Sequence, residues 1–170
     1  MKTFEKAVLA VNRWALILLM AAMSVIIFIN VIDRYFDGEA LPWAEEVARH
    51  MMIWLTFLGA GPVLRYGGHI AVENLQDTLP RAAAIALRAL IALLLLAFFV
   101  FLIWWGLLYV QRAQFQTTAA TQISFAYIYA ALPIGGVLLV LHFLFIVRDY
   151  VLDRRFASDD HFDANASASL

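Results

Sequence analysis

Residues 14–32 read WALILLMAAMSVIIFINVI and contain no charged side chain. A run of about 20 apolar residues is long enough to cross the hydrocarbon core of a bilayer as a helix. Three further apolar stretches occupy residues 47–64, 89–110 and 123–147. Together they leave little of the 170-residue chain for other structure, so the sequence predicts a small polytopic membrane protein.

The composition agrees with this class. Apolar residues make up 64% of the chain and charged residues only 15%, whereas about a quarter of the residues in soluble domains are charged. The net charge is −1 and no Lys/Arg run occurs, so no nucleic-acid partner is expected. The chain has no cysteine, which excludes a disulfide framework, a thiolate nucleophile and a cysteine metal site.

The first apolar run is too long for the hydrophobic region of a signal peptide, which spans roughly 7 to 15 residues. No small-residue cleavage site follows it, because residues 30–34 read NVIDR. We therefore interpret this run as a membrane anchor.

The predicted fold is an all-α integral membrane protein with four transmembrane helices in one domain, residues 1–156. The spacing of apolar residues after the second helix predicts a short interfacial segment in the following loop. The Ala-, Ser- and Asp-rich residues 157–170 predict a disordered tail. The helices are expected at about residues 10–32, 43–65, 81–110 and 123–148.

Basic residues predict the orientation, because short loops rich in Lys and Arg stay in the cytoplasm. With the N-terminus inside, only Arg34, Arg49 and Arg112 lie outside. Both termini are therefore expected in the cytoplasm, together with the loop that carries the interfacial segment. The inner basic residues are Lys2, Lys6, Arg13, Arg65, Arg81, Arg88, Arg148, Arg154 and Arg155.

Candidate chemistry is sparse within the predicted spans. An ionisable group at mid-depth would indicate a functional site, and none is present. His50 and His142 differ in predicted depth by roughly 20 Å at 1.5 Å per residue, so one haem cannot bridge them. We interpret His142 as a neutral packing or interface residue. No hydrolase triad, phosphate loop or metal-ligand spacing occurs, so neither an enzyme nor a metal site is expected.

Small residues and proline mark two expected helix contacts. The cluster that contains Gly59 predicts close packing of another helix, with an ion site as the alternative. Pro133, followed by two glycines, predicts a kink or a close helix approach.

A charged cluster is expected at the outer side. Glu45 precedes Arg49 by one helical turn in the favourable order for an ion pair, and Glu46 and Arg34 lie nearby. The cluster is either a docking site or a solvated group of charges.

Six segments, taken together, resemble the small membrane subunit of a tripartite ATP-independent periplasmic (TRAP) transporter. The likeness extends over nearly all of residues 14–150, and Glu73 departs from it where an Asp is expected. The segments are NVIDRY (30–35), PWAEEVAR (42–49), WLTFLGA (54–60), RYGGHIAV (65–72), LP (79–80) and YAALPIG (129–135).

The resemblance implies a scaffold role in the sodium-coupled uptake of a small organic acid. The implied partners are a large membrane subunit, which holds the substrate and sodium sites, a periplasmic substrate-binding protein and membrane lipids. The location is then the cytoplasmic membrane of a bacterium or archaeon, and no cofactor is expected in this chain. Candidate interface or structural residues are Arg34, Trp43, Glu45, Glu46, Arg49, Gly59, Gly68, His69 and Pro133, and Asp37 and Glu39 are candidates for docking the binding protein.

Two other classes remain open on the residues alone. A membrane-anchor subunit of a respiratory enzyme should show histidine pairs at matching depth. A stand-alone channel or carrier should show polar residues along one helix face at mid-depth.

Overall fold

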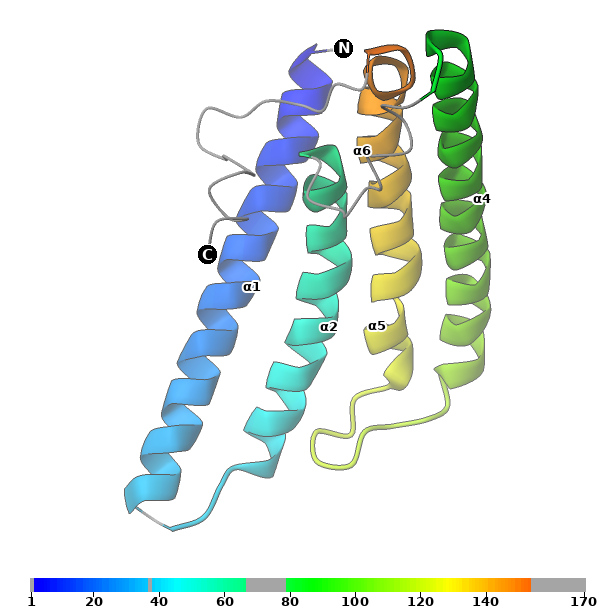
Figure 1. Cartoon of the computed structure of the whole chain (residues 1–170). Helices are drawn as coiled ribbons and strands as arrows, with labels where there is room; N and C mark the ends of the chain where they lie inside the picture. Colours follow the sequence, from blue (N-terminus) through cyan, green and yellow to red (C-terminus); the bar gives the residue numbers. More distant parts are fainter. Residues whose placement is uncertain (1, 37, 67–78, 154–170) are drawn as a thin grey trace.

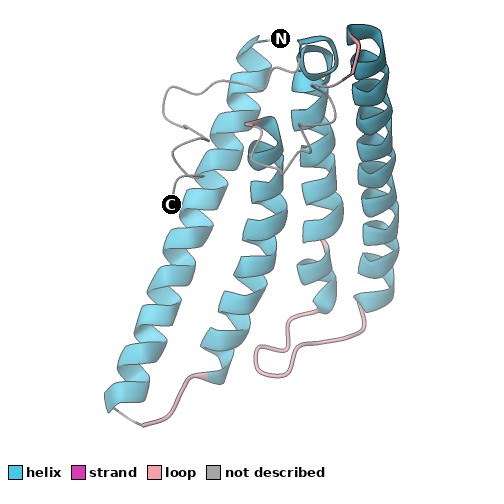
Figure 2. Cartoon of the chain, viewed as in Figure 1, coloured by secondary structure: helices cyan, strands magenta, loops and turns pink. Residues whose placement is uncertain are grey.

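The structure is a computed structural model in which residues 2–36, 38–66 and 79–153 are described. Their helices are α1 (Lys2–Phe36), α2 (Pro42–Arg65), α4 (Arg81–Ala113), α5 (Phe125–Tyr129) and α6 (Ala131–Asp153). Figure 2 shows helices joined by loops, and within the described ranges the only strand-like pairing is an isolated bridge between Thr117 and Ser124. The prediction of an all-α protein is confirmed.

Four helical stretches are long and apolar enough to cross a membrane, as predicted. They are Thr3–Phe36, Pro42–Arg65, Arg81–Ala113 and Phe125–Leu152, the last of which combines α5 and α6. The 35-residue α1 is about 52 Å long at 1.5 Å per residue. It therefore exceeds the hydrocarbon core, which is about 30 Å thick.

The structure extends the first, third and fourth helices to Phe36, Ala113 and Asp153, and two further differences concern the start of the first helix and the continuity of the fourth. The first helix begins at Lys2 and not near residue 10, because its charged first turns continue the helix beyond the apolar run. The fourth is interrupted at Ala130, between α5 and α6. Pro133 lies one turn later, and its ring nitrogen cannot donate the hydrogen bond that a continuous helix needs. The predicted interfacial segment falls largely on residues 67–78, and the predicted disordered tail on 154–170; both ranges lie outside the described residues.

The helices lie side by side in one open layer in the order α1, α2, α6, α4 (Figure 1). Helix α6 lies between α2 and α4, and it buries the most residues. In the most apolar part of the fourth span, Phe125–Leu152, 44% of the residues are buried, whereas none is buried in the most apolar part of the first span. The fourth span is thus the centre of the layer, and α1 is its edge.

Small residues allow the central helices to approach closely. A Cβ atom added to Gly135 would lie 2.9 Å from the backbone oxygen of Phe57 in α2. A Cβ added to Gly136 would lie 2.7 Å from the Cγ1 atom of Ile103 in α4. The two adjacent glycines therefore admit α2 on one side of α6 and α4 on the other, as the predicted close approach requires.

The apolar core lies toward the end of the layer where α6 terminates. Phe99 of α4 and Phe143 of α6 meet edge to face, with ring centroids 5.9 Å apart. Large apolar side chains elsewhere remain exposed along all four spans, including Leu18, Met52, Phe98 and Leu144. In a membrane protein such surfaces face lipid or another protein. The buried members of the core are Leu64, Ala92, Phe99, Leu139, Phe143 and Ile146.

Candidate functional site

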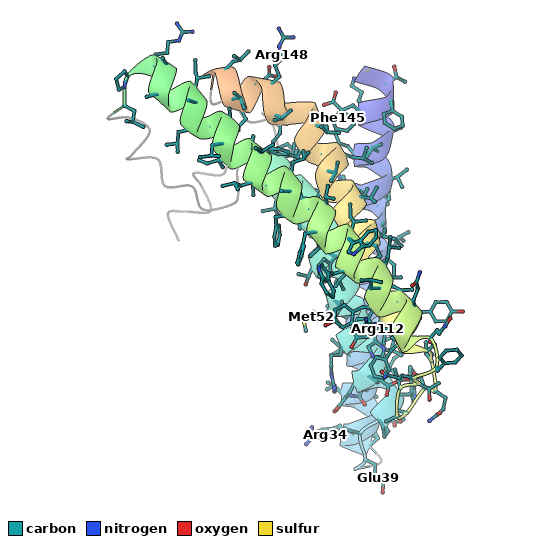
Figure 3. All side chains as sticks on the ribbon, turned by 90° about the vertical axis from the view of Figure 1, so that its right-hand side faces the viewer. Arg34, Glu39, Met52, Arg112, Phe145 and Arg148 are labelled. Carbon is teal, nitrogen blue, oxygen red and sulfur yellow. The ribbon has the colours of Figure 1, made fainter. Side chains whose placement is uncertain are left out.

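The predicted charged cluster does not form a network. Among the described residues no ion pair joins Arg34, Glu45, Glu46 and Arg49. Figure 3 places Arg34 with Glu39 at one end of the molecule and Arg148 at the opposite end. Arg34, Glu45 and Arg49 are exposed, which leaves them available to a partner or to solvent.

Glu46 instead binds the loop between α4 and α5. Its carboxylate accepts hydrogen bonds from the backbone N–H of Ala120 at 2.8 Å, from that of Thr121 at 3.1 Å, and from the Thr121 hydroxyl. Within the loop, the Thr118 N–H donates to the carbonyl of Ile123 at 2.9 Å. An anionic acceptor for several N–H and O–H donors makes stronger bonds than a neutral one. Glu46 thus ties the start of α2 to a loop that is distant in the sequence.

The remaining predicted site residues are scattered along the chain. Trp43 is half-exposed, with 42% of its surface accessible, at the start of α2. A Cβ added to Gly59 would meet only the side chain of Leu16, at 3.8 Å, which is an ordinary contact. Pro133 packs against α4, because a Cβ added to Gly106 would lie 2.8 Å from the Cδ atom of Pro133. Asp37, Gly68 and His69 lie outside the described residues.

A second polar cluster lies at the other end of the layer, between α1, α2 and α6. Glu5 in the first turn of α1 forms an ion pair with Arg65, the last residue of α2. Asn12 donates from Nδ2 to the carbonyl of Leu58 at 3.1 Å and lies 3.4 Å from Nε2 of His142. Asn12, Arg65 and His142 are buried, with 3%, 8% and 0% of their surfaces exposed. We call Glu5, Asn12, Arg65 and His142 the inner cluster.

The Asn12 contacts define the hydrogen-bonding state of His142. The Leu58 carbonyl can only accept, so the NH₂ group of Asn12 faces it. The same NH₂ group lies 3.4 Å from Nε2 of His142, so a hydrogen bond there requires Nε2 to accept and the ring proton to lie on Nδ1. His142 is therefore a neutral packing residue in this arrangement, as the sequence predicted, and it also makes a specific polar contact.

Neither cluster has the composition of a metal or haem site. Within the described ranges, no group of three or more His, Cys, Asp or Glu residues is placed to hold a metal ion. His142 is enclosed by Asn12 and Gly61, since a Cβ added to Gly61 would lie 2.5 Å from the ring. A haem iron would have to displace Asn12 to reach Nε2, so the geometry does not favour the respiratory-anchor alternative.

Sequence reasoning missed Glu5, Asn12 and Asn30. Asn30 in α1 accepts a hydrogen bond from the backbone N–H of Leu41 at 2.7 Å. The available signal was the presence of asparagine inside or beside an uncharged apolar run. A polar side chain there needs a partner and is often found at a helix contact.

The comparison with known families decides the identity. Residues 23–151 match the family described as "Tripartite ATP-independent periplasmic transporters, DctQ component". The chain belongs to this family. The resemblance inferred from the six segments is thereby confirmed, and the family is one of transport components and not of enzymes, as predicted.

Individual relatives carry matching names. A putative TRAP transporter small permease protein of Haemophilus influenzae is 37% identical over 62 residues, which cover 36% of this chain and 38% of that protein. The ectoine TRAP transporter small permease protein TeaB of Halomonas elongata is 32% identical over 76% of this chain and 66% of its own length. The matched regions thus span less than two thirds of these two relatives.

A third relative is larger. The sialic acid TRAP transporter permease protein SiaT of Haemophilus influenzae is 25% identical over 126 residues. The match covers 74% of this chain but only 20% of that protein. A region similar to this TRAP small permease therefore occurs inside a much longer permease chain.

Proposed function

We propose that this chain is the small scaffold subunit of a TRAP-type secondary transporter. In this role it supports a large membrane subunit during the sodium-coupled uptake of a small organic acid, which a periplasmic binding protein delivers. The large subunit holds the substrate and sodium sites. The complex lies in the cytoplasmic membrane of a bacterium or archaeon, with both termini of this chain in the cytoplasm.

The open layer of helices is the observation that carries this proposal. A protein that conducts solute alone needs helices that enclose a polar path, whereas these helices lie side by side and expose apolar residues from every span. Such a layer has long edges on which a larger membrane protein can pack. The proposed role is therefore to widen the footprint of the large subunit and to resist its tilting while its transport region moves.

The match to SiaT supports a large partner. That relative is named as a permease, and the similar region is only 20% of its length. In SiaT the region similar to this chain and the much longer remainder belong to one polypeptide. This implies that the two parts work at close range. We propose the same proximity here, with the large subunit as a separate polypeptide.

The relatives also bear on the substrate. Their names give ectoine for one transporter and sialic acid for another, although both resemble this chain over most of its length. Related small subunits thus accompany different cargoes. This supports the view that the recognition groups lie on other chains.

Co-purification tests the scaffold proposal. An affinity tag on this chain should retain the large TRAP membrane subunit of the same organism when both are produced in one cell. Replacing Arg34 or Arg49, the exposed basic residues near the outer end, should lower the joint recovery. Absence of the large protein from the eluate, although both proteins are present in the membrane, would contradict the proposal.

The exposed acidic residues between the end of α1 and the first turn of α2 are proposed to guide the binding protein. Glu39 and Glu45 are exposed, whereas Glu46 is occupied by the α4–α5 loop. Charges at the rim of an interface mainly change the association rate, and salt screens them. The double variant Glu39→Gln/Glu45→Gln should therefore slow uptake at low salt, with normal recovery of the complex. Unchanged uptake at low salt would remove the docking role.

A further inference from the structure

Helix α1 is attached to the rest of the molecule in an unusual way. None of the residues in its most apolar window is buried. Its buried residue is the polar Asn12, at 3% exposure, outside that window. In lipid, apolar side chains gain little by leaving the bilayer for a protein surface, so polar contacts and close packing hold helices together. Half-buried apolar residues such as Leu16, which lies beside Gly59 of α2, also pack α1 against α2, so the polar contacts of α1 act together with this packing.

These contacts share one register between two antiparallel helices. Glu5 pairs with Arg65 and Asn12 pairs with Leu58. Seven residues, about two helical turns, separate the two contacts on each helix, so they lie on one face of α1 and one face of α2. A slip of one helix along the other would break both contacts together.

Helix α6 closes the same region from a third side. His142 meets Asn12, and Phe145, one turn later, contacts Arg65 of the ion pair and Phe4, the residue before Glu5. The Phe145 ring lies 5.9 Å from the Arg65 guanidinium and 6.4 Å from the ring of Phe4. Gly61 allows the His142 ring to approach α2, because any side chain there would occupy the position of the ring. The inner cluster thus joins three helices through two sets of contacts, one at Asn12 and His142 and one at Glu5 and Arg65.

The inner cluster is also costly to bury. The buried atoms Asn12 Oδ1, Arg65 Nε and Nη1, and His142 Nδ1 have no partner among the protein atoms. A buried polar group without a hydrogen-bond partner destabilises the folded state, because it has lost its bonds to water. Apolar side chains would fill the same space without leaving polar atoms unpaired. They would not, however, define one alignment of α1 along α2. The polar composition therefore favours a positional role over a purely stabilising one.

We propose that Glu5, Asn12, Arg65 and His142 form a latch that sets where α1 lies against α2 and α6. The remaining helices, α2, α6 and α4, pack through apolar residues and glycines and do not depend on this latch. Helix α1 is then an arm at the edge of the layer, and the four residues are positioning residues. This inference goes beyond the proposed scaffold role and is tested on the chain itself.

A distance measurement between spin labels tests the latch. The chain has no cysteine, so labels can be placed at Val11→Cys in α1 and Val63→Cys in α2, both exposed and near the latch. The purified full chain in lipid nanodiscs should give one narrow distance peak. Glu5→Gln and Asn12→Leu should each replace it with a broad distribution that extends to longer distances. The charge swap Glu5→Arg/Arg65→Glu should restore the narrow peak.

Ser24→Ala is the matched control. The Ser24 hydroxyl bonds only the Met20 carbonyl of its own helix, at 2.9 Å on an exposed face, so the narrow peak should persist. A parent-like peak in either Glu5→Gln or Asn12→Leu, or a swap as broad as the single variants, would overturn the proposal. None of these readouts involves uptake, so failure of the latch and failure of the scaffold role are distinguishable.

Discussion

Gly135 is a residue at which the backbone of another helix leaves no room for a side chain. An added Cβ would lie 2.6 Å from Cβ and 2.9 Å from the backbone oxygen of Phe57. Backbone cannot yield as a flexible side chain can, so Gly135→Ala should lower the unfolding free energy by ~1–3 kcal/mol through overpacking. Thermal or denaturant unfolding of the purified protein measures this change.

Gly59→Ala is the control for that prediction. The nearest contact of its added Cβ is a Leu16 side chain at 3.8 Å, so its stability should remain close to that of the parent. Equal stabilities of the two variants would contradict the packing described for α2 and α6.

The sequence indicated that glycines in both helices mark contacts. It could not predict which glycine has the tightest contact, because that depends on which atoms of another helix lie opposite.

Glu46 has a role that only the folded chain reveals. Glu46→Ala removes the acceptor for the N–H groups of Ala120 and Thr121. Those amides should then exchange with solvent faster, as measured by hydrogen–deuterium exchange. Glu45→Ala is the matched control, since the Glu45 side chain is exposed and makes no hydrogen bond within the described residues. Unchanged exchange in the loop of Glu46→Ala would show that the carboxylate does not hold it. The sequence marked Glu46 as a candidate interface residue, but it could not predict a partner so distant along the chain.

At the scale of elements, the corner between α1 and α2 depends on one side chain. Leu41, the N-cap residue of α2, provides no side-chain cap, and Asn30 of α1 accepts its N–H. Asn30→Leu should weaken this corner by about 1 kcal/mol, the usual net value of one hydrogen bond. Faster hydrogen exchange at the first turn of α2 would report it. Thr56→Ala, which removes a hydroxyl bonded within its own helix, should leave that exchange unchanged. Faster exchange at the first turn of α2 in Thr56→Ala than in Asn30→Leu would contradict the role of Asn30.

The four spans could be predicted from the sequence because runs of apolar residues are a strong signal. The bounds of α1 could not, because its first turns are charged and amphipathic and lie outside any apolar window. The interruption at Ala130 was indicated by Pro133, but the shift of the break toward the α4–α5 loop was not. The sequence also could not predict which helices are neighbours. A span that is apolar on all sides has no single apolar face that would indicate where another helix packs.

At the scale of the whole molecule, the four spans place both ends of the helical region on one side of the membrane. The distribution of basic residues predicts that this side is the cytoplasm. An alkaline phosphatase fusion after Gly38 should therefore be active, and a fusion at Asp153 inactive. Because that enzyme folds only outside the cytoplasm, the reverse pattern would overturn the predicted orientation.

The central claim is that this TRAP small permease supports transport without conducting solute itself. Uptake into sealed vesicles under an imposed sodium gradient tests this claim directly, with a radiolabelled organic acid and its binding protein supplied outside. Vesicles that contain the chain together with its large subunit should accumulate the acid, and vesicles with the chain alone should accumulate none. Gradient-dependent accumulation by the chain alone would contradict the account.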